Sequence, residues 1–333
     1  YKRSYLVADQ RNYVVLLIQQ TVRLIQVVGQ IVFLLLTHNY IIYLLILIFS
    51  TLLNNVAITA YINKKHPWIK KGTKEKLNKS EKKPIFDNVK SIVIYKLGSV
   101  ILNGTDNLII AGFLKTAYVG LCSNYVLLIS TVSTIISQAF SGLSASIGNY
   151  NVNADPVSNE RIFEQLTFIG FWIFGFLSIS LACLLNPFIQ IWLGEDYVLS
   201  ESIAISLAAS FYFLVINNVP ASYRTAMGFF RQARTAPLLA SVINIGLSII
   251  LAKTVGLAGV FIATSISRIF TFCIIDPYYV YKLGFGKSSK KYFNIFLLRI
   301  MVISVTFLIT RYLISCVNID GIIGFFVKAI TSI

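Results

Sequence analysis

YVVLLIQQTVRLIQVVGQIVFLLLT, residues 13–37, is a mostly apolar run that contains one arginine and four glutamines. It reaches the roughly 17 to 25 residues that a helix needs to cross the hydrocarbon core of a bilayer. At 100° per residue, Gln19, Arg23, Gln26 and Gln30 project within about 60° of one another. The run therefore predicts a transmembrane helix whose polar side chains share one face.

Apolar segments recur along the whole chain. The 333 residues are 56% hydrophobic and 13% charged, and the mean hydropathy is +0.74, which is more apolar than soluble domains. We expect an all-α polytopic membrane protein with about ten transmembrane helices, at residues 13–37, 39–61, 89–112, 117–149, 163–186, 199–217, 234–254, 257–283, 292–313 and 321–333. The last segment is short, and the chain opens on Tyr1 without a signal-peptide pattern, so we expect missing sequence at both ends.

The basic residues separate into two unequal groups when the segments alternate across the membrane. One side receives 21 of the 29 lysines and arginines, and the other receives two. The positive-inside rule makes the basic side cytoplasmic. The lysine-rich linker at residues 62–88 is predicted to be cytoplasmic and too polar to fold alone, and it suits contact with anionic lipid headgroups. Interleaved aromatic residues are nearly absent from it, which disfavours nucleic acid as a partner.

Two further segments carry polar residues at helical spacing. In the segment 89–112, Lys96, Ser99, Asn103, Asp106 and Asn107 fall within an arc of about 100°. The segment 257–283 places Arg268 near its middle, on one face with two threonines. Deep cations are costly in lipid and face protein, water or a ligand.

Two interpretations of these deep charges stay open. The cations face either a buried carboxylate or a water-filled path that admits an anionic ligand. Asp106 is either the ion-pair partner of Arg23 or Arg268, or a protonatable site for ion coupling. Asp276, which precedes a proline near the basic side, is predicted to mark a helix kink or boundary.

Signals for an enzyme or a metal centre are weak. Four cysteines occur singly and only two histidines are present, so we expect no metal site and no cofactor. No histidine, paired-aspartate motif or glycine-rich phosphate loop accompanies the loop acids. We therefore expect a protein that is not an enzyme.

Several stretches resemble the polysaccharide flippases of the MATE-like (MOP) superfamily, often called Wzx or oligosaccharide transporters. The resemblance covers most of the chain and is carried by YKRSYLVADQRNYV at 1–14, YKLGSVILNGTDNLIIAGFLKTAYVGLCSNY at 95–125, SQAFSGLSASIGN at 137–149, and YRTAMGFFRQARTAPLLASVINIGLSIILAKTVGLAGVFIATSIS at 223–267. None of these stretches is a catalytic signature.

The resemblance implies a two-lobe architecture in which about four helices are missing in front. Residues 1–61 would be the last two helices of the N-terminal lobe and 62–88 the cytoplasmic linker between lobes. Residues 89–283 would form a six-helix C-terminal lobe, and residues 284–333 two additional helices, the last one truncated.

The implied activity is movement of undecaprenyl-pyrophosphate-linked polysaccharide repeat units across the bacterial cytoplasmic membrane by alternating access. The implied partners are the lipid-linked oligosaccharide, membrane lipids and polysaccharide biosynthesis proteins, with no nucleic acid. We expect the substrate cavity to be lined by Arg23, Gln19, Gln26, Gln30, Lys96, Asn103, Asn107 and Arg268. The alternatives are a MATE-type drug or cation antiporter, a lipid II flippase and, from another class, a membrane glycan polymerase or ligase.

Overall fold

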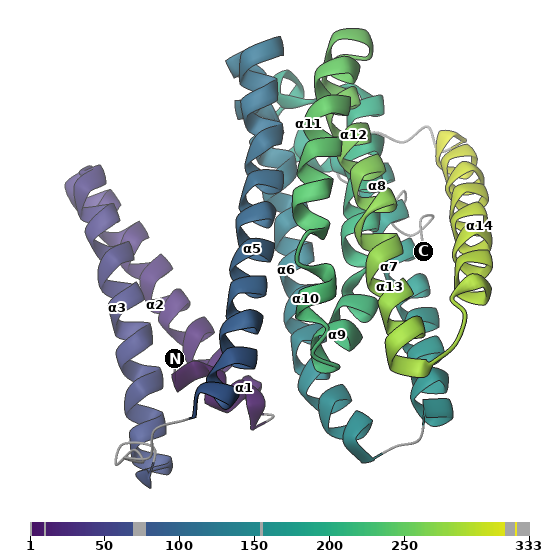
Figure 1. Ribbon diagram of the computed structural model, residues 1–333. Coiled ribbons are helices and arrows are strands. Elements are labelled where there is room, and N and C mark those ends of the chain that lie inside the picture. Colours follow the sequence, from purple (N-terminus) through teal and green to yellow (C-terminus); the bar gives the residue numbers. More distant parts are fainter. Residues whose placement is uncertain (1, 10, 69–77, 154–155, 317–323, 325–333) are drawn as a thin grey trace. The chain divides into compact units, whose positions relative to one another are not determined.

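The computed structural model describes residues 2–9, 11–68, 78–153, 156–316 and 324, which form helices joined by short connections and contain no strand (Figure 1). Nine helices in this part of the chain are long and apolar enough to cross a membrane. The predicted all-α, multi-pass membrane fold is thus confirmed. The tenth predicted segment, 321–333, lies almost entirely outside the described residues.

The chain divides into two compact units, Tyr1–Glu81 and Lys82–Ile333, each considered by itself. In the first unit, α1 (Lys2–Ala8) and the long helices α2 (Asn12–Thr37) and α3 (Tyr40–Lys65) pack around a small apolar core. The turn between the long helices is tight. His38 adopts a left-handed conformation, and the Asn39 side chain accepts a hydrogen bond of 2.9 Å from the backbone N–H of Ile41.

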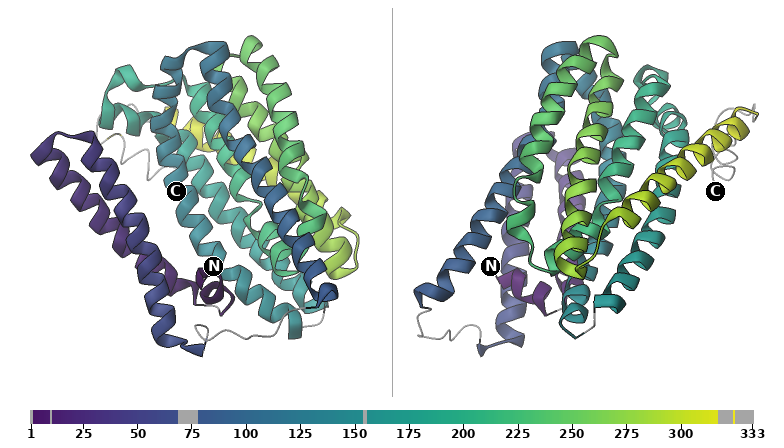
Figure 2. Two further views of the ribbon diagram at one scale, coloured as in Figure 1. Left: turned by 60° about the vertical axis from the view of Figure 1, so that its left-hand side comes forward. Right: turned by 45° about the vertical axis from the view of Figure 1, so that its right-hand side comes forward.

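The second unit contains the remaining long helices. They are α5 (Lys79–Ile109), α6 (Thr116–Asn153), α7 (Pro156–Leu193), α8 (Glu201–Val215), α11 (Ala236–Thr254), α12 (Leu257–Phe270) and α14 (Lys290–Ser315). Helix α5 begins inside the predicted linker 62–88 and ends in the π-helix η1 (Ile110–Leu114), so the apolar segment underestimates its length. Helix α12 packs against both α11 and α8, and α14 crosses obliquely over α7 (Figure 2).

Two of the spans are broken: Glu201–Ala226, which continues beyond the predicted segment 199–217, and the predicted segment 257–283. After α8 the chain turns at residues 216–217 and resumes as α9 (Asn218–Ala226), which has Pro220 in its first turn. After α12 it breaks at Thr271 and continues as α13 (Phe272–Tyr279), which contains Pro277, and the π-helix η3 (Val280–Phe285). Proline lacks the N–H that a continuous helix needs, which accounts for irregularity near both prolines. The short helix α10 (Phe230–Ala233) precedes α11.

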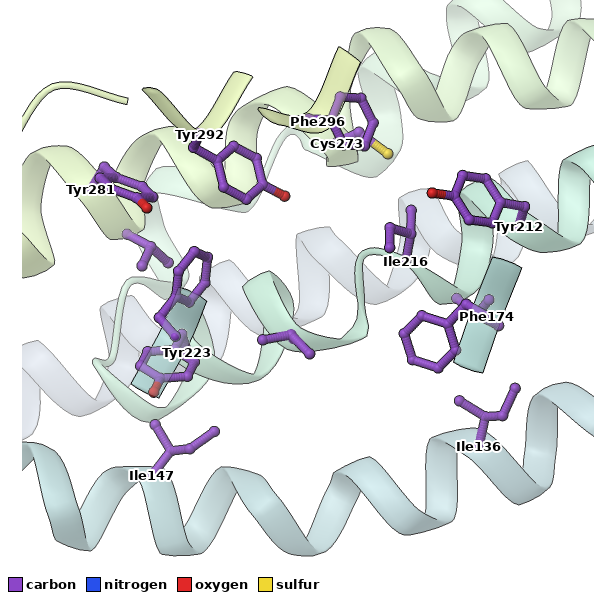
Figure 3. Packing of buried hydrophobic residues seen from close by; sticks show 14 of the residues in the cluster. Ile136, Ile147, Phe174, Tyr212, Ile216, Tyr223, Cys273, Tyr281, Tyr292 and Phe296 are labelled. Atoms are coloured by element: carbon purple, nitrogen blue, oxygen red, sulfur yellow. The ribbon is translucent and has the colours of Figure 1, made fainter. Parts of the chain in front are cut away.

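Aromatic side chains fill one of the two cores of this unit. Tyr223, Tyr281 and Tyr292 come from α9, η3 and α14 and share the cluster shown in Figure 3. The ring of Phe163, on α7, lies 5.0 Å from Tyr223 and 5.6 Å from Tyr281, both edge to face. Edge-to-face contacts of this kind stabilise a core beyond the area they bury.

Two ion pairs join the N-terminal end of α7 to the first turn of α14 and to the connection that precedes it. Lys287 pairs with Glu160, and the Nζ of Lys291 lies 2.8 Å from Oε1 of Glu164. At the other end of α14, Nη2 of Arg311 lies 2.7 Å from Oε2 of Glu201 on α8. Ion pairs therefore hold α14 near both of its ends.

Candidate functional site

A cavity of about 200 Å³ lies inside the second unit. Helix α5 forms one wall, the broken pair α8 and α9 a second, and the broken pair α12 and α13 a third. Its lining is Tyr95, Ser99, Leu102, Asn103, Phe213, Leu214, Asn217, Asn218, Ala221, Arg268 and Phe272. A cavity with amide, hydroxyl and guanidinium groups within membrane-spanning helices is the default candidate for a ligand site.

Arg268 is the cation of this cavity wall. It lies in the last turn of α12, and its Nη1 donates to the carbonyl oxygen of Ser210 at 2.7 Å and to the Ser210 hydroxyl at 2.8 Å. These bonds fix the guanidinium against α8. They use one nitrogen, and among the described contacts Nε and Nη2 remain as donors. A guanidinium suits phosphate because its donors match two oxygens at once.

Asp106 lies one turn beyond Asn103 on α5 and sits in a network of neutral groups. The Thr264 hydroxyl lies 2.9 Å from Oδ2 of Asp106, and Nδ2 of Asn244 lies 3.3 Å from Oδ1. The Thr105 hydroxyl in turn donates to Oδ1 of Asn244 at 2.9 Å. Helices α5, α11 and α12 thus meet at one carboxylate.

An ion pair between Asp106 and Arg268, one of the alternatives that the sequence leaves open, is not formed among the described residues. Arg268 is close enough to act on Asp106 electrostatically, but its hydrogen bonds go to Ser210. The carboxylate therefore has hydroxyl and amide partners only. Carboxylate, amide and hydroxyl oxygens are hard ligands, so this network is the place where a cation or proton could be held.

A second acid, Asp276, forms an ion pair with Arg224, and this pair lies on the side of the cavity away from Asp106. Nε of Arg224 lies 2.8 Å from Oδ1 of Asp276, and both side chains are buried. Nδ2 of Asn217 donates to Oδ2 of Asp276 at 2.8 Å, and the Arg224 guanidinium lies 5.1 Å from the centre of the Tyr95 ring. Asn217 and Tyr95 both line the cavity, so they join it to the ion pair.

This ion pair adds to what the sequence predicts for Asp276. The residue is more than the mark of a helix kink or boundary, since it is the buried anchor of α9 on α13. Its partner Arg224 is buried as well, on the helix that starts at the break after α8. A sequence segment shows that a charge is present but not which distant residue neutralises it.

The sequence-predicted cavity residues of the second unit separate into two groups. Asn103 and Arg268 line the cavity together. Lys96 and Asn107, on α5, have exposed side chains and do not belong to the lining. A helical stripe of about 100° is wider than the wall that one helix contributes here, so only part of it reaches the cavity.

The polar stripe of α2 belongs to the first unit. Gln30 is buried, and its Nε2 donates to the carbonyl oxygen of Tyr43 on α3 at 3.3 Å. Nε2 of Gln26 donates to Oε1 of Gln30 at 3.4 Å. Gln19 is partly exposed and Arg23 is exposed within its unit. Part of the stripe therefore joins α2 to α3, and Arg23 stays open to a partner.

Several cavity residues were not predicted from the sequence. Asn217 and Asn218 stand at the break between α8 and α9, and Tyr95 lies on α5 beside Lys96. A signal for them was present, because two asparagines directly before Val219 and Pro220 interrupt an apolar run. Such a break exposes polar groups inside a membrane only where they line a cavity or find partners in the protein.

Comparison of the chain with models of protein families, with curated proteins and with solved structures finds no match.

Proposed function

We propose that this protein is a flippase for lipid-linked oligosaccharides that moves undecaprenyl-pyrophosphate-linked repeat units across the bacterial cytoplasmic membrane. The observation that carries the proposal is the membrane-embedded cavity in which Arg268 stands among Asn103, Asn217 and Asn218. A cation suits the pyrophosphate, and amides suit sugar hydroxyls. The resemblance of the sequence to polysaccharide flippases supports the same substrate class.

The cavity is small for the whole substrate. About 200 Å³ lies below the roughly 300 to 1,000 Å³ of pockets that hold drug-sized ligands. In the proposed mechanism, the cavity in the described state accommodates only one polar group of the substrate. The cavity walls separate when the repeat unit enters. The breaks at residues 216–217 and at Thr271 are the places where α8 and α12 can bend, and both adjoin the cavity.

Asp106 supplies the coupling site in this proposal. A cation or proton on the carboxylate would change its bonds to Thr264 and Asn244, which join three helices. Asp106 does not line the cavity, whereas Arg268 does. The coupling ion and the anionic substrate therefore have separate binding places within the same helix bundle.

A lipid II flippase is the second candidate, because its ligand carries the same pyrophosphate and would meet the same cation. A MATE-type cation antiporter fits less well, because the cavity wall presents a guanidinium, Asp276 is already neutralised by Arg224, and Asp106 lies outside the cavity lining. A glycan polymerase or ligase requires reactive groups that the described cavity wall lacks.

The test is flipping in proteoliposomes that contain a fluorescent undecaprenyl-pyrophosphate oligosaccharide, scored by the access of a membrane-impermeant quencher. We expect Arg268→Ala to lower the initial rate at least tenfold, because the guanidinium proposed to bind the pyrophosphate is lost. Lys115→Ala, at an exposed connection, should match the unmodified protein. An Arg268→Ala variant that folds and flips normally would show that the cationic cavity is not the substrate site.

The coupling role has its own measurement. We expect Asp106→Asn to keep flipping without an ion gradient but to lose the acceleration that a sodium or proton gradient produces, because the charge that attracts the ion is gone. Thr264→Val should weaken this acceleration, and Ser99→Ala, on the cavity wall, should leave it unchanged. Normal acceleration in Asp106→Asn would contradict the coupling role and leave the substrate site untouched.

A further inference from the structure

Arg299 is a membrane-depth arginine that the proposed transport site does not use. It lies in the middle part of α14, and its guanidinium stands over two rings of α7, 5.9 Å from the centre of Phe168 and 5.6 Å from that of Phe171. Among the described residues no carboxylate lies within ion-pair distance of it. Glu164 acts on it electrostatically but bonds to Lys291. A charge at this depth without an acidic partner requires another anion or a path to the membrane surface.

An apolar crevice begins directly beside this arginine. Its volume is about 140 Å³, and it lies between α7, α8 and α14. Ile300, Ile303, Ser304 and Phe307 line it along α14, over about 10 Å of helix. An apolar cavity of about 150 Å³ stays free of water and accepts a hydrocarbon. The crevice therefore suits part of one lipid chain and not a polar headgroup.

The polar side chains beside the crevice leave its surface apolar. The hydroxyls of Ser178 and Ser304 donate to the carbonyl oxygens of Ala208 and Ile300. Tyr212 also lines the crevice, but its hydroxyl is buried and has no hydrogen-bond partner among the described residues. Figure 3 shows the hydroxyls of Tyr212 and Tyr292 pointing toward each other. The crevice therefore offers an apolar surface to a hydrocarbon chain.

The direction of the Arg299 side chain indicates the leaflet from which a lipid would bind. Side chains of an α-helix point toward its N-terminus, which for α14 is the lysine-rich end. The Arg299 guanidinium is thus directed toward the headgroups of that leaflet, while the crevice extends from Ile300 in the opposite direction. A lipid with its phosphate at Arg299 and its acyl chain in the crevice would have its headgroup toward the membrane surface and its chain toward the membrane interior, as in a bilayer.

We propose that the seam between α7, α8 and α14 is a binding site for one anionic phospholipid of the lysine-rich leaflet. Arg299 binds the phosphate, and one acyl chain fills the crevice. The proposal is independent of what the transport cavity carries.

Trp172 gives a reporter for this site. It is exposed on α7, and its ring lies 6.3 Å from that of Phe168 and 5.5 Å from that of Phe171, the two rings beneath Arg299. With Trp68 and Trp192 replaced by phenylalanine, quenching by dibrominated lipids reports binding near Trp172 alone. We expect dibrominated phosphatidylglycerol to bind about fivefold more tightly than dibrominated phosphatidylcholine, the ratio that one basic residue supplies.

The variants separate a site from a general preference for anionic lipid. Arg299→Gln should bring the ratio to about one, and Arg299→Lys should keep most of it. Arg311→Gln, the matched arginine of the same helix, is paired with Glu201 and should leave the ratio unchanged. A ratio near one in the parent protein, or an unchanged ratio in Arg299→Gln, would overturn the proposal.

The crevice is tested by counting lipids. Native mass spectrometry of the protein in mild detergent should retain one phosphatidylglycerol, and Ala209→Phe, which fills the crevice, should release it without lowering the melting temperature. Absence of retained lipid in the parent protein would instead indicate that the chain itself or a second copy covers the crevice, and the proposal would be wrong.

Discussion

At the scale of single residues, the pair of Arg224 and Asp276 shows how this fold accommodates charge within the membrane. Each side chain is buried, and each has a second contact, Tyr95 for the arginine and Asn217 for the carboxylate. Transfer of two charges out of water is costly, and removal of only one partner leaves the other unpaired. The ion pair therefore contributes more to the alignment of α9 on α13 than to the net stability of the protein.

We expect Asp276→Asn to lower the free energy of unfolding by about 3 kcal/mol, because Arg224 is left buried without a counter-charge. Arg224→Gln combined with Asp276→Asn should cost less than the sum of the two single changes. The measurement is SDS titration in mixed micelles. Glu201→Gln breaks the exposed pair with Arg311 and serves as the control, with an expected loss below about 1 kcal/mol. Equal losses of unfolding free energy in Asp276→Asn and Glu201→Gln would show that the buried ion pair is no more important than the exposed one.

At the scale of elements, α5 and α11 approach closely at one glycine. A Cβ added to Gly98 would lie 2.7 Å from the backbone nitrogen of Leu238, and the Ser241 hydroxyl donates to the Gly98 carbonyl oxygen at 3.0 Å. Small residues permit such approaches between membrane helices. The contact places Ser99, the next residue, in the cavity wall.

Gly98→Ala should therefore push α5 away from α11. We expect a loss of about 1 to 3 kcal/mol, the usual cost of an added group in a packed interface, and a visible fall in melting temperature in detergent. Gly104→Ala is the matched control, because that glycine lies on the same helix and a Cβ added there would meet no neighbouring helix within 4 Å. Helix propensity alone favours alanine over glycine, so Gly104→Ala should not lower the melting temperature. A fall of equal size in both variants would show that the α5–α11 contact is not responsible.

How much of these elements the sequence predicts depends on the range of the interaction. The apolar segments and the polar stripe of 89–112 are local patterns, and Asn103 and Arg268 follow from them. The pair of Arg224 and Asp276 does not, because it forms only when α9 and α13 pack. Local patterns also overestimate the cavity, since Lys96 shares the stripe of Asn103 but not its position in the wall.

At the scale of the whole molecule, the unequal distribution of basic residues makes a prediction about orientation. We expect a membrane-impermeant maleimide added to intact cells to label Asp196→Cys and to label Ser288→Cys only after permeabilisation, because the lysine-rich side is retained in the cytoplasm. Both positions are exposed connections, and the exposed Cys316 is replaced by serine in both variants. Labelling of Ser288→Cys in intact cells would reverse the assignment.

The two ion pairs at the start of α14 have a consequence for its register against α7. Glu160 and Glu164 are four residues apart on α7, and they pair with Lys287, in the connection before α14, and with Lys291, in its first turn. A slip of α14 by one turn, about 5.4 Å, would separate Lys291 from Glu164. Each exposed pair stabilises the protein little by itself. Together they favour one longitudinal alignment of α14, which an apolar helix surface specifies poorly.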